Sequence, residues 1–312
     1  MSAFLHYLEL SVPLFALVFV GYALMHWGHW PKTISEGLSR FVFSVALPAL
    51  LFRLMADRSK LPPVDARLLL AFFGGCLIVF VIGRIVGARL FRLDGVAGSV
   101  FALGGIFSNN VLLGVPLAKV TLGEAALPTV ALVVVFNALT LWTLVTVSVE
   151  WSRHGSLSLH GFGRTLKGVL TNPLVAAILS GTLFGLTGLP LPALIDTPLA
   201  MTGQAATPMA LIALGMGLAE YGIRTGWQQS VGISVLKLIV QPLVVWVLAR
   251  LLGLPAIETQ AVVLLASLAT GANVYLMSRQ FKTMEGPVAS SLVLTTALAA
   301  VTTPLALALV GG

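Results

Sequence analysis

Residues 107–119 read Phe-Ser-Asn-Asn-Val-Leu-Leu-Gly-Val-Pro-Leu-Ala-Lys and lie within a long apolar segment. Polar groups without partners are costly in hydrocarbon, because no water is present to hydrogen-bond them. Pro116 cannot donate a helical hydrogen bond, and its ring clashes with the preceding turn. The pattern therefore predicts a membrane helix that is interrupted near Asn110–Pro116, with Gly114 and Pro116 opening it. A kinked helix with satisfied amides is the simpler alternative.

The composition is that of an integral membrane protein. Of 312 residues, 58% are hydrophobic and 9% are charged, whereas soluble domains carry about 25% charge. The mean hydropathy is +1.00. The net charge of +7 comes from scattered residues without a basic run, so it does not predict nucleic-acid binding. The single cysteine, Cys76, excludes an intrachain disulfide and a cysteine-cluster metal site, and we expect neither a metal nor a cofactor.

Ten apolar segments, each of a length that can cross a bilayer as a helix, are separated by short, more polar connections. They cover roughly residues 5–25, 33–54, 67–91, 95–120, 126–149, 168–187, 193–219, 229–252, 257–280 and 286–310. The fold class predicted is therefore all-α, with ten transmembrane helices. The first segment lacks a basic region before it, so we interpret it as a span rather than as a signal peptide.

The two halves of the chain resemble each other. Short motifs recur in the same order at an offset of about 160 residues; among them, Leu47-Pro48-Ala49 corresponds to Thr207-Pro208-Met209, and Asn110-Val111 to Asn273-Val274. We therefore divide the chain into a five-span repeat at 1–150, a linker at 151–167 and a second repeat at 168–312. Because each repeat has an odd number of spans, the second copy must be inverted in the membrane.

Lysine and arginine set the orientation. Eleven of them lie on the side of the central linker and six on the side of both termini. Since cytoplasmic loops are enriched in these residues, we expect both termini on the non-cytoplasmic side of the cell's inner membrane and the linker in the cytoplasm.

A second interrupted segment is expected in the ninth span, at Ser267–Met277. Gly271 can open the helix there, and the inverted repeat would place it against the first interruption, near the bilayer midplane. Freed N–H groups and helix N-termini suit an anion, whereas freed carbonyls and C-termini suit a cation. Two packing kinks that merely touch are the alternative. The candidate substrate-binding residues are Asn109, Asn110, Asn137, Thr270, Asn273 and Tyr275, although Asn137 could equally serve helix packing.

Lys237 lies deep in the eighth span, one helical turn before Gln241. A charge at the bilayer centre costs at least about 2.5 kcal/mol. Lys237 could neutralise an anionic substrate or stand in for a bound cation, with Gln241 beside it; alternatively, it snorkels or caps freed carbonyls. Neither interrupted segment carries a carboxylate at mid-span, which argues against strong cation coupling.

These motifs together resemble the auxin efflux carrier family in its compact bacterial form, within the superfamily that includes bile acid:sodium symporters. The resemblance rests on Leu47–Phe52, Ser108-Asn109-Asn110 with Gly114-Val115-Pro116, Asn172-Pro173-Leu174, Pro208 with Ala213-Leu214-Gly215, and Lys237 five residues before Pro242. It covers nearly the whole chain. One departure is that this chain has no proline near Ala269–Thr270, where family members commonly have one, so Gly271 must open the helix.

The resemblance implies a sodium/proton antiporter-like fold with crossed discontinuous helices in spans 4 and 9. Spans 1, 2, 6 and 7 would form a scaffold, and spans 3–5 and 8–10 a mobile transport unit that works by an elevator-type movement. Plant members export an aromatic acid, the auxin indole-3-acetate, and form dimers through the scaffold. Bacterial members are linked to small carboxylates such as malate or malonate.

The expected function is thus a secondary active or facilitative transporter of small organic anions. We expect it to work as an exporter, in the lipid bilayer and as a homodimer. The alternative is a sodium-coupled importer of the bile acid symporter type, and the coupling ion, proton or sodium, stays open. An intramembrane enzyme is disfavoured, because the spans contain no nucleophile–base pair and no set of metal ligands.

Overall fold

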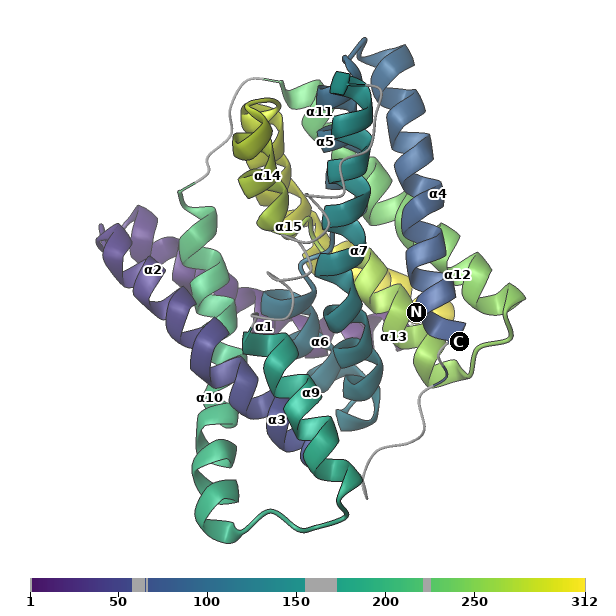
Figure 1. Ribbon diagram of the computed structural model, residues 1–312. Helices are drawn as coiled ribbons and strands as arrows, with labels where there is room; N and C mark the ends of the chain where they lie inside the picture. The colour runs from purple at the N-terminus through teal and green to yellow at the C-terminus, as the bar shows by residue number, and fades with distance from the viewer. Residues whose placement is uncertain (1, 58–64, 66, 155–172, 221–225, 312) are drawn as a thin grey trace.

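The computed structural model describes residues 2–57, 65, 67–154, 173–220 and 226–311, and within them it is helical with short connections (Figure 1). The longer helices, in chain order, are α1 Ser2–His26, α2 Lys32–Phe41, α3 Leu47–Ala56, α4 Arg67–Leu90, α5 Gly95–Gly104, α6 Val115–Thr121, α7 Leu127–His154, α9 Pro173–Leu186, α10 Ala193–Leu218, α11 Trp227–Val235, α12 Gln241–Leu251, α13 Ala256–Ser267, α14 Asn273–Phe281 and α15 Glu285–Val310. The predicted all-α class is confirmed for these residues.

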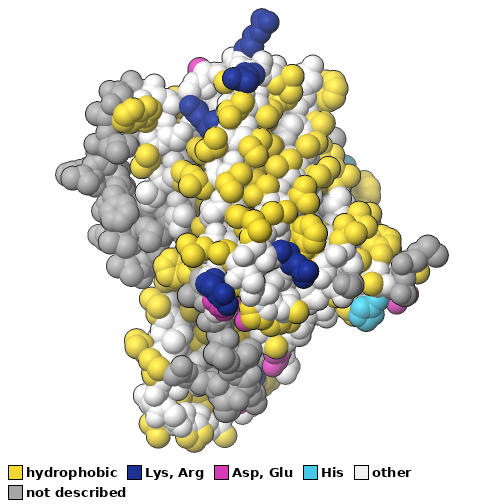
Figure 2. All heavy atoms as spheres, turned by 90° about the vertical axis from the view of Figure 1, so that its right-hand side faces the viewer, with side chains coloured by type: hydrophobic (Ala, Val, Ile, Leu, Met, Phe, Trp, Pro, Cys, Tyr) yellow, Lys and Arg dark blue, Asp and Glu magenta, His cyan; other side chains and the backbone are white. Residues whose placement is uncertain are grey.

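Among the described residues, six helical segments are long and apolar enough to cross a membrane: Ala3–His26, Lys32–Ala56, Arg67–Leu90, Ala193–Leu218, Trp227–Leu251 and Glu285–Val310. Figure 2 shows hydrophobic side chains covering the middle of one face, with lysine and arginine side chains above and below them. Exposed leucine, isoleucine and valine side chains of α4 and α12 contribute to this side of the molecule. An apolar band bounded by charge is the surface that a bilayer requires, so the chain is a multi-pass membrane protein.

The helices pack in two sets. In the first, α1 runs along α10, and α3 packs on both α9 and α10. In the second, α4, α5, α7, α12, α13 and α15 pack on one another. The sets meet where α1 contacts α15 and where α7 contacts α3 and α9.

In the part of the chain that the structure describes, three membrane helices contain a π-helical turn, at Val42–Ala46, Asn110–Gly114 and Leu236–Val240. Each turn ends two residues before a proline: Pro48, Pro116 or Pro242. A proline in an α-helix lacks the N–H donor and clashes with the carbonyl four residues earlier. The wider turn accommodates the ring, so the helix bends locally and continues.

This turn explains why the predicted position of the first interruption is wrong. The helix is open at residues 105–109, between α5 and the π-helical turn, rather than at Asn110–Pro116. Gly114 lies within that turn and Pro116 in the first turn of α6, so neither residue opens the helix. The second interruption, at residues 268–272, contains Gly271 as predicted.

The boundaries of the predicted linker are only partly described. Helix α7 continues through residues 151–154, which were assigned to the linker. Residues 155–167 lie outside the described residues, as does Asn172 of the Asn172-Pro173-Leu174 motif.

Candidate functional site

The two interrupted segments lie against each other and pair through their backbones. The N–H of Asn109 donates to the carbonyl of Ala269 at 2.9 Å, and the N–H of Gly271 donates to the carbonyl of Phe107 at 2.8 Å. Ser108 and Thr270 thus form an isolated antiparallel bridge. A Cβ at Gly271 would lie 3.1 Å from the Ser108 oxygen, so the absent side chain allows the two backbones to approach.

The carbonyls freed at the end of α5 are capped by side chains from other helices. The hydroxyl of Thr270 donates to the Gly104 carbonyl at 3.1 Å, and Nε2 of Gln241 donates to the Ile106 carbonyl at 2.9 Å. These acceptors have lost their helical partners, and left bare at this depth each would cost several kcal/mol.

The end of α13 is capped in the same manner. Nζ of Lys237 donates to the Ala266 carbonyl at 2.5 Å, and the hydroxyl of Thr303 donates to the Ser267 carbonyl at 2.9 Å. Of the roles considered for Lys237, capping of a freed carbonyl is therefore the one that the structure shows. A lysine at a helix C-terminus also opposes the negative end of the helix dipole.

The two restarted helices leave their N-terminal N–H groups unsatisfied by side-chain caps. The first restarts at Asn110 and the second at Asn273, and neither Asn109 nor Ala272 caps the following turn with its side chain. The first N–H groups of a helix carry a partial positive charge, although those of Val274 and Tyr275 at the start of α14 already donate to the carbonyls of Gly271 and Ala272, at 3.0 Å each. The N-termini of the two restarted helices converge on the same part of the structure, and this arrangement suits the binding of an anion.

A cavity of about 440 Å³ lies at these two helix starts, within the size range of small-molecule sites. Five of the six predicted binding residues line it: Asn109, Asn110, Asn137, Thr270 and Asn273. Gly271 lines it as well. Its apolar walls come from the π-helical turn at Val42–Ala46 and from α7, α9, α10 and α15, including Phe43, Val134, Leu174, Leu214 and Leu292. Among the described residues, its lining contains no charged side chain.

Two polar atoms on residues of the cavity lining have no hydrogen-bond partner among the described residues: Oγ of Ser108 and Oδ1 of Asn110. The two side chains are 1% and 3% exposed. The other end of the Asn110 amide is engaged, since Nδ2 donates to Oδ1 of Asn137 at 3.2 Å. Buried polar groups are rarely left unpaired, so these two atoms remain available for a hydrogen bond beside the cavity.

Not every predicted site residue belongs to this lining. Tyr275 does not line the cavity, and Lys237 and Gln241 are fully buried at the C-terminal ends of α13 and α5 instead. The sequence did not predict a role for Thr303, which caps the Ser267 carbonyl, or for Thr295. The hydroxyl of Thr295 accepts a hydrogen bond from the Thr270 N–H at 3.0 Å. Both lie on α15, and only the presence of several threonines within an apolar span could have drawn attention to them.

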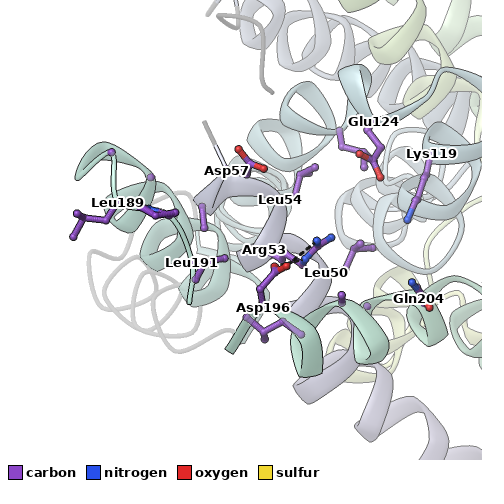
Figure 3. Close-up of a pocket in the computed structure, with 18 residues that line it drawn as sticks. Leu50, Arg53, Leu54, Asp57, Lys119, Glu124, Leu189, Leu191, Asp196 and Gln204 are labelled. Atoms are coloured by element: carbon purple, nitrogen blue, oxygen red, sulfur yellow. Dashed lines mark hydrogen bonds and ion pairs between the residues drawn. The ribbon is translucent and has the colours of Figure 1, made fainter. Parts of the chain in front are cut away.

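A second cavity, of about 560 Å³, opens at the opposite ends of the same helices (Figure 3). The smaller cavity is lined by Ser39 of α2, whereas this one is lined by Leu50 and Arg53 of α3, farther along that span. Figure 3 shows Arg53 paired with Asp196 of α10, at 2.5 Å, and Lys119 and Glu124 on another wall. In the part of the chain that the structure describes, no group of His, Cys, Asp and Glu side chains could hold a metal ion.

Comparison with known proteins agrees with these observations. The model of a family described as membrane transport protein matches residues 6–307. A protein of Rhizobium meliloti (strain 1021) named "Putative malonate transporter" is 27% identical over 94% of this chain and 92% of its own length. An uncharacterized transporter of Methanocaldococcus jannaschii is 24% identical over 90% of this chain and 91% of its own. Another, from Methanothermobacter thermautotrophicus, is 25% identical over 95% of this chain and 96% of its own.

The match spans nearly the whole chain, includes both interrupted helices, and agrees with the resemblance to auxin efflux carriers. The chain therefore belongs to the membrane transport protein family and is a membrane transporter, not an enzyme.

Proposed function

We propose that this protein is a secondary transporter of small organic anions, and that the cavity between the two interrupted helices binds the substrate. The observation that carries the proposal is the convergence of two uncapped helix N-termini on a cavity with unpartnered polar atoms. The N–H groups at the two helix starts would hold the carboxylate, and Asn109, Asn110 and Asn273 would complete its shell. The "malonate" in the name of one relative favours a small carboxylate over an aromatic acid.

The capped carbonyls argue for an anion and against a sodium-coupled carrier. A sodium site built at an interrupted helix would use freed backbone carbonyls. Here four of those carbonyls accept hydrogen bonds from Lys237, Gln241, Thr270 and Thr303. Lys237 donates from its Nζ to the carbonyl at one of these ends, the C-terminus of α13. We therefore favour sodium-independent transport and place Lys237 and Gln241 in charge balance at the helix ends.

The proposed topology has ten spans in two inverted repeats with the interrupted helices crossing. The interruptions at 105–109 and 268–272 occupy equivalent positions of the two repeats, which supports it. Both termini would lie outside the cytoplasm.

The mechanism we propose is an elevator-type movement of one helix set against the other, with export as the direction and a homodimer formed through α1, α3, α9 and α10. The two packing sets supply the parts for such a movement, since both cavities lie where the sets meet.

The test is counterflow of labelled malonate into proteoliposomes that contain the purified protein. Wild type should exchange the anion, with trans-stimulation that a channel would not show, and equally well in sodium and potassium buffers. Asn110→Ala should lose exchange, whereas Thr121→Val, at the far end of α6 and outside the cavity lining, should retain it. Normal exchange by Asn110→Ala would reject the site, and exchange that requires sodium would favour the symporter alternative.

A further inference from the structure

We propose that the site selects an organic acid that carries one carboxylate and, in addition, one hydrogen-bond donor. A dicarboxylic acid would be carried as its singly protonated monoanion, and a hydroxy acid would fit in the same way. This inference rests on the proposed function and deepens it, because it states which ionic form and which second group the cavity accepts.

The described lining of the cavity is uncharged. The described lining of the cavity comes from α2, α7, α9, α10, α14, α15 and the two interruptions, and it contains no Lys, Arg, His, Asp or Glu. Lys237, which lies within the eighth span, donates to the Ala266 carbonyl and does not line the cavity. Helix N-termini offer only partial charges, each equivalent to about half a unit. Such a site can compensate one carboxylate, but a dianion would bring a second charge with no counter-charge.

Asn110 and Asn137 form a hydrogen-bonded amide pair in the cavity lining. Asn110 donates through Nδ2 to Oδ1 of Asn137, which leaves the Asn110 oxygen as an unpartnered buried acceptor. If both amides were turned over, the roles would be exchanged, but the pair would still leave one acceptor and one donor unused. A ligand with acceptors alone cannot satisfy this pair. A ligand with an O–H group as well as a carboxylate can satisfy both.

The remaining polar contact fits the same ligand. Ser108, adjacent to the bridge between the two interruptions, has an unpartnered hydroxyl that can donate to a carboxylate. The carboxylate would thus bind at Ser108 and the helix starts, and the donor group at the Asn110–Asn137 pair.

Four acids separate these requirements in a competition assay on the full-length protein in proteoliposomes: malonate, monomethyl malonate, 3-hydroxypropionate and propionate. Monomethyl malonate carries the same single charge as hydrogen malonate but lacks the donor, and propionate lacks the donor of 3-hydroxypropionate. Because leaving a buried acceptor unpaired weakens binding by about tenfold or more, each donor-bearing acid should compete at least about tenfold better than its matched analogue. The comparison is made at about pH 6, with each concentration expressed as the monoanion.

Acidity provides an independent readout. When the pH is lowered from about 8 to about 6 at constant total concentration, the monoanion fraction of malonate rises as its second carboxyl group becomes protonated. Malonate flux should rise with that fraction, whereas 3-hydroxypropionate, whose charge does not change in this range, should be carried at a nearly constant rate. The comparison separates ionisation of the ligand from ionisation of the protein.

A variant connects the preference to the amide pair. In Asn137→Leu, the Asn110 amide is released and can turn either end toward the ligand, so the advantage of malonate over its monomethyl ester should fall toward onefold. Thr121→Val should keep the wild-type ratio. Equal competition by malonate and its monoester in wild type, or malonate flux that follows the dianion, would overturn the inference while leaving anion transport intact. If folded protein carries none of the four acids, the proposed function itself fails.

Discussion

At the scale of single residues, two threonines perform the same task at the two interruptions. Thr270 donates to the carbonyl of Gly104, and Thr303 donates to the carbonyl of Ser267. Replacing either by the isosteric valine would leave a buried carbonyl without its donor and should cost about 1–3 kcal/mol. We expect Thr270→Val and Thr303→Val to lower the melting temperature of the purified protein. Thr303 does not line the cavity, so its variant reports on folding alone.

Thr296→Val is the matched control for both variants. Thr296 is also buried on α15, but its hydroxyl donates to the Leu292 carbonyl four residues earlier in the same helix. That carbonyl keeps its helical partner when the hydroxyl is removed, so the melting temperature should stay close to wild type. Equal losses in all three variants would show that the caps at the interruptions have no special weight.

At the scale of helices, α1 and α10 approach closely at two glycines. A Cβ at Gly215 would lie 1.8 Å from the Val18 carbonyl oxygen, and one at Gly21 would lie 2.1 Å from the Ile212 oxygen. Both obstacles are backbone atoms, which cannot move without separating the helices. We expect Gly215→Ala to destabilise the protein, measured as a lower melting temperature and a smaller monodisperse fraction in size-exclusion chromatography.

Gly217 allows a direct comparison two residues farther along α10. A Cβ at this position meets nothing within 4 Å. Gly217→Ala should therefore fold normally. The higher helix propensity of alanine than of glycine also favours the folded helix. A destabilisation similar to that of Gly215→Ala would mean that glycine matters here for helix flexibility rather than for close packing.

The proline rings define another prediction at this scale. In Pro116→Ala, the new N–H can donate to the preceding turn, and the π-helical turn at Asn110–Gly114 can relax to an α-helix. Relaxation by one residue would rotate Asn110 away from the cavity. We expect malonate exchange to fall while the melting temperature is retained or rises. Unchanged exchange would show that the wide turn does not position Asn110.

The interrupted helices also show how far the sequence could be interpreted. Asn110 and Asn273 mark the restarts of both helices, and five of the six proposed binding residues line one cavity. The exact opening of the first helix was not predictable from Pro116, because a π-helical turn accommodates the ring without ending the helix. The caps from Thr303 and Gln241 depend on which distant helices pack there, and hydrophobic periodicity does not contain that information.

At the scale of the whole molecule, the two cavities lie at opposite ends of α10 and of the span formed by α2 and α3. Ala213 and Leu214 of α10 line the smaller cavity, and Ala200 and Gln204 line the larger. Buried apolar residues lie between these levels, among them Ala206, Ala210 and Leu211. A barrier between two opposed openings is what alternating access requires, and the proposed inverted topology would supply its two states.

The last prediction concerns the sides to which these cavities open. Single cysteines at Ser39 and at Ala200 would report on the smaller and the larger cavity, and the native Cys76 is buried and should give little background. Under the proposed topology, a membrane-impermeant maleimide should label Ser39→Cys from the cytoplasmic side and Ala200→Cys from the opposite side. If the helix sets move during transport, saturating malonate should change the two labelling rates in opposite directions. Labelling of both positions from one side would contradict the topology, and rates that do not respond to malonate would contradict the movement.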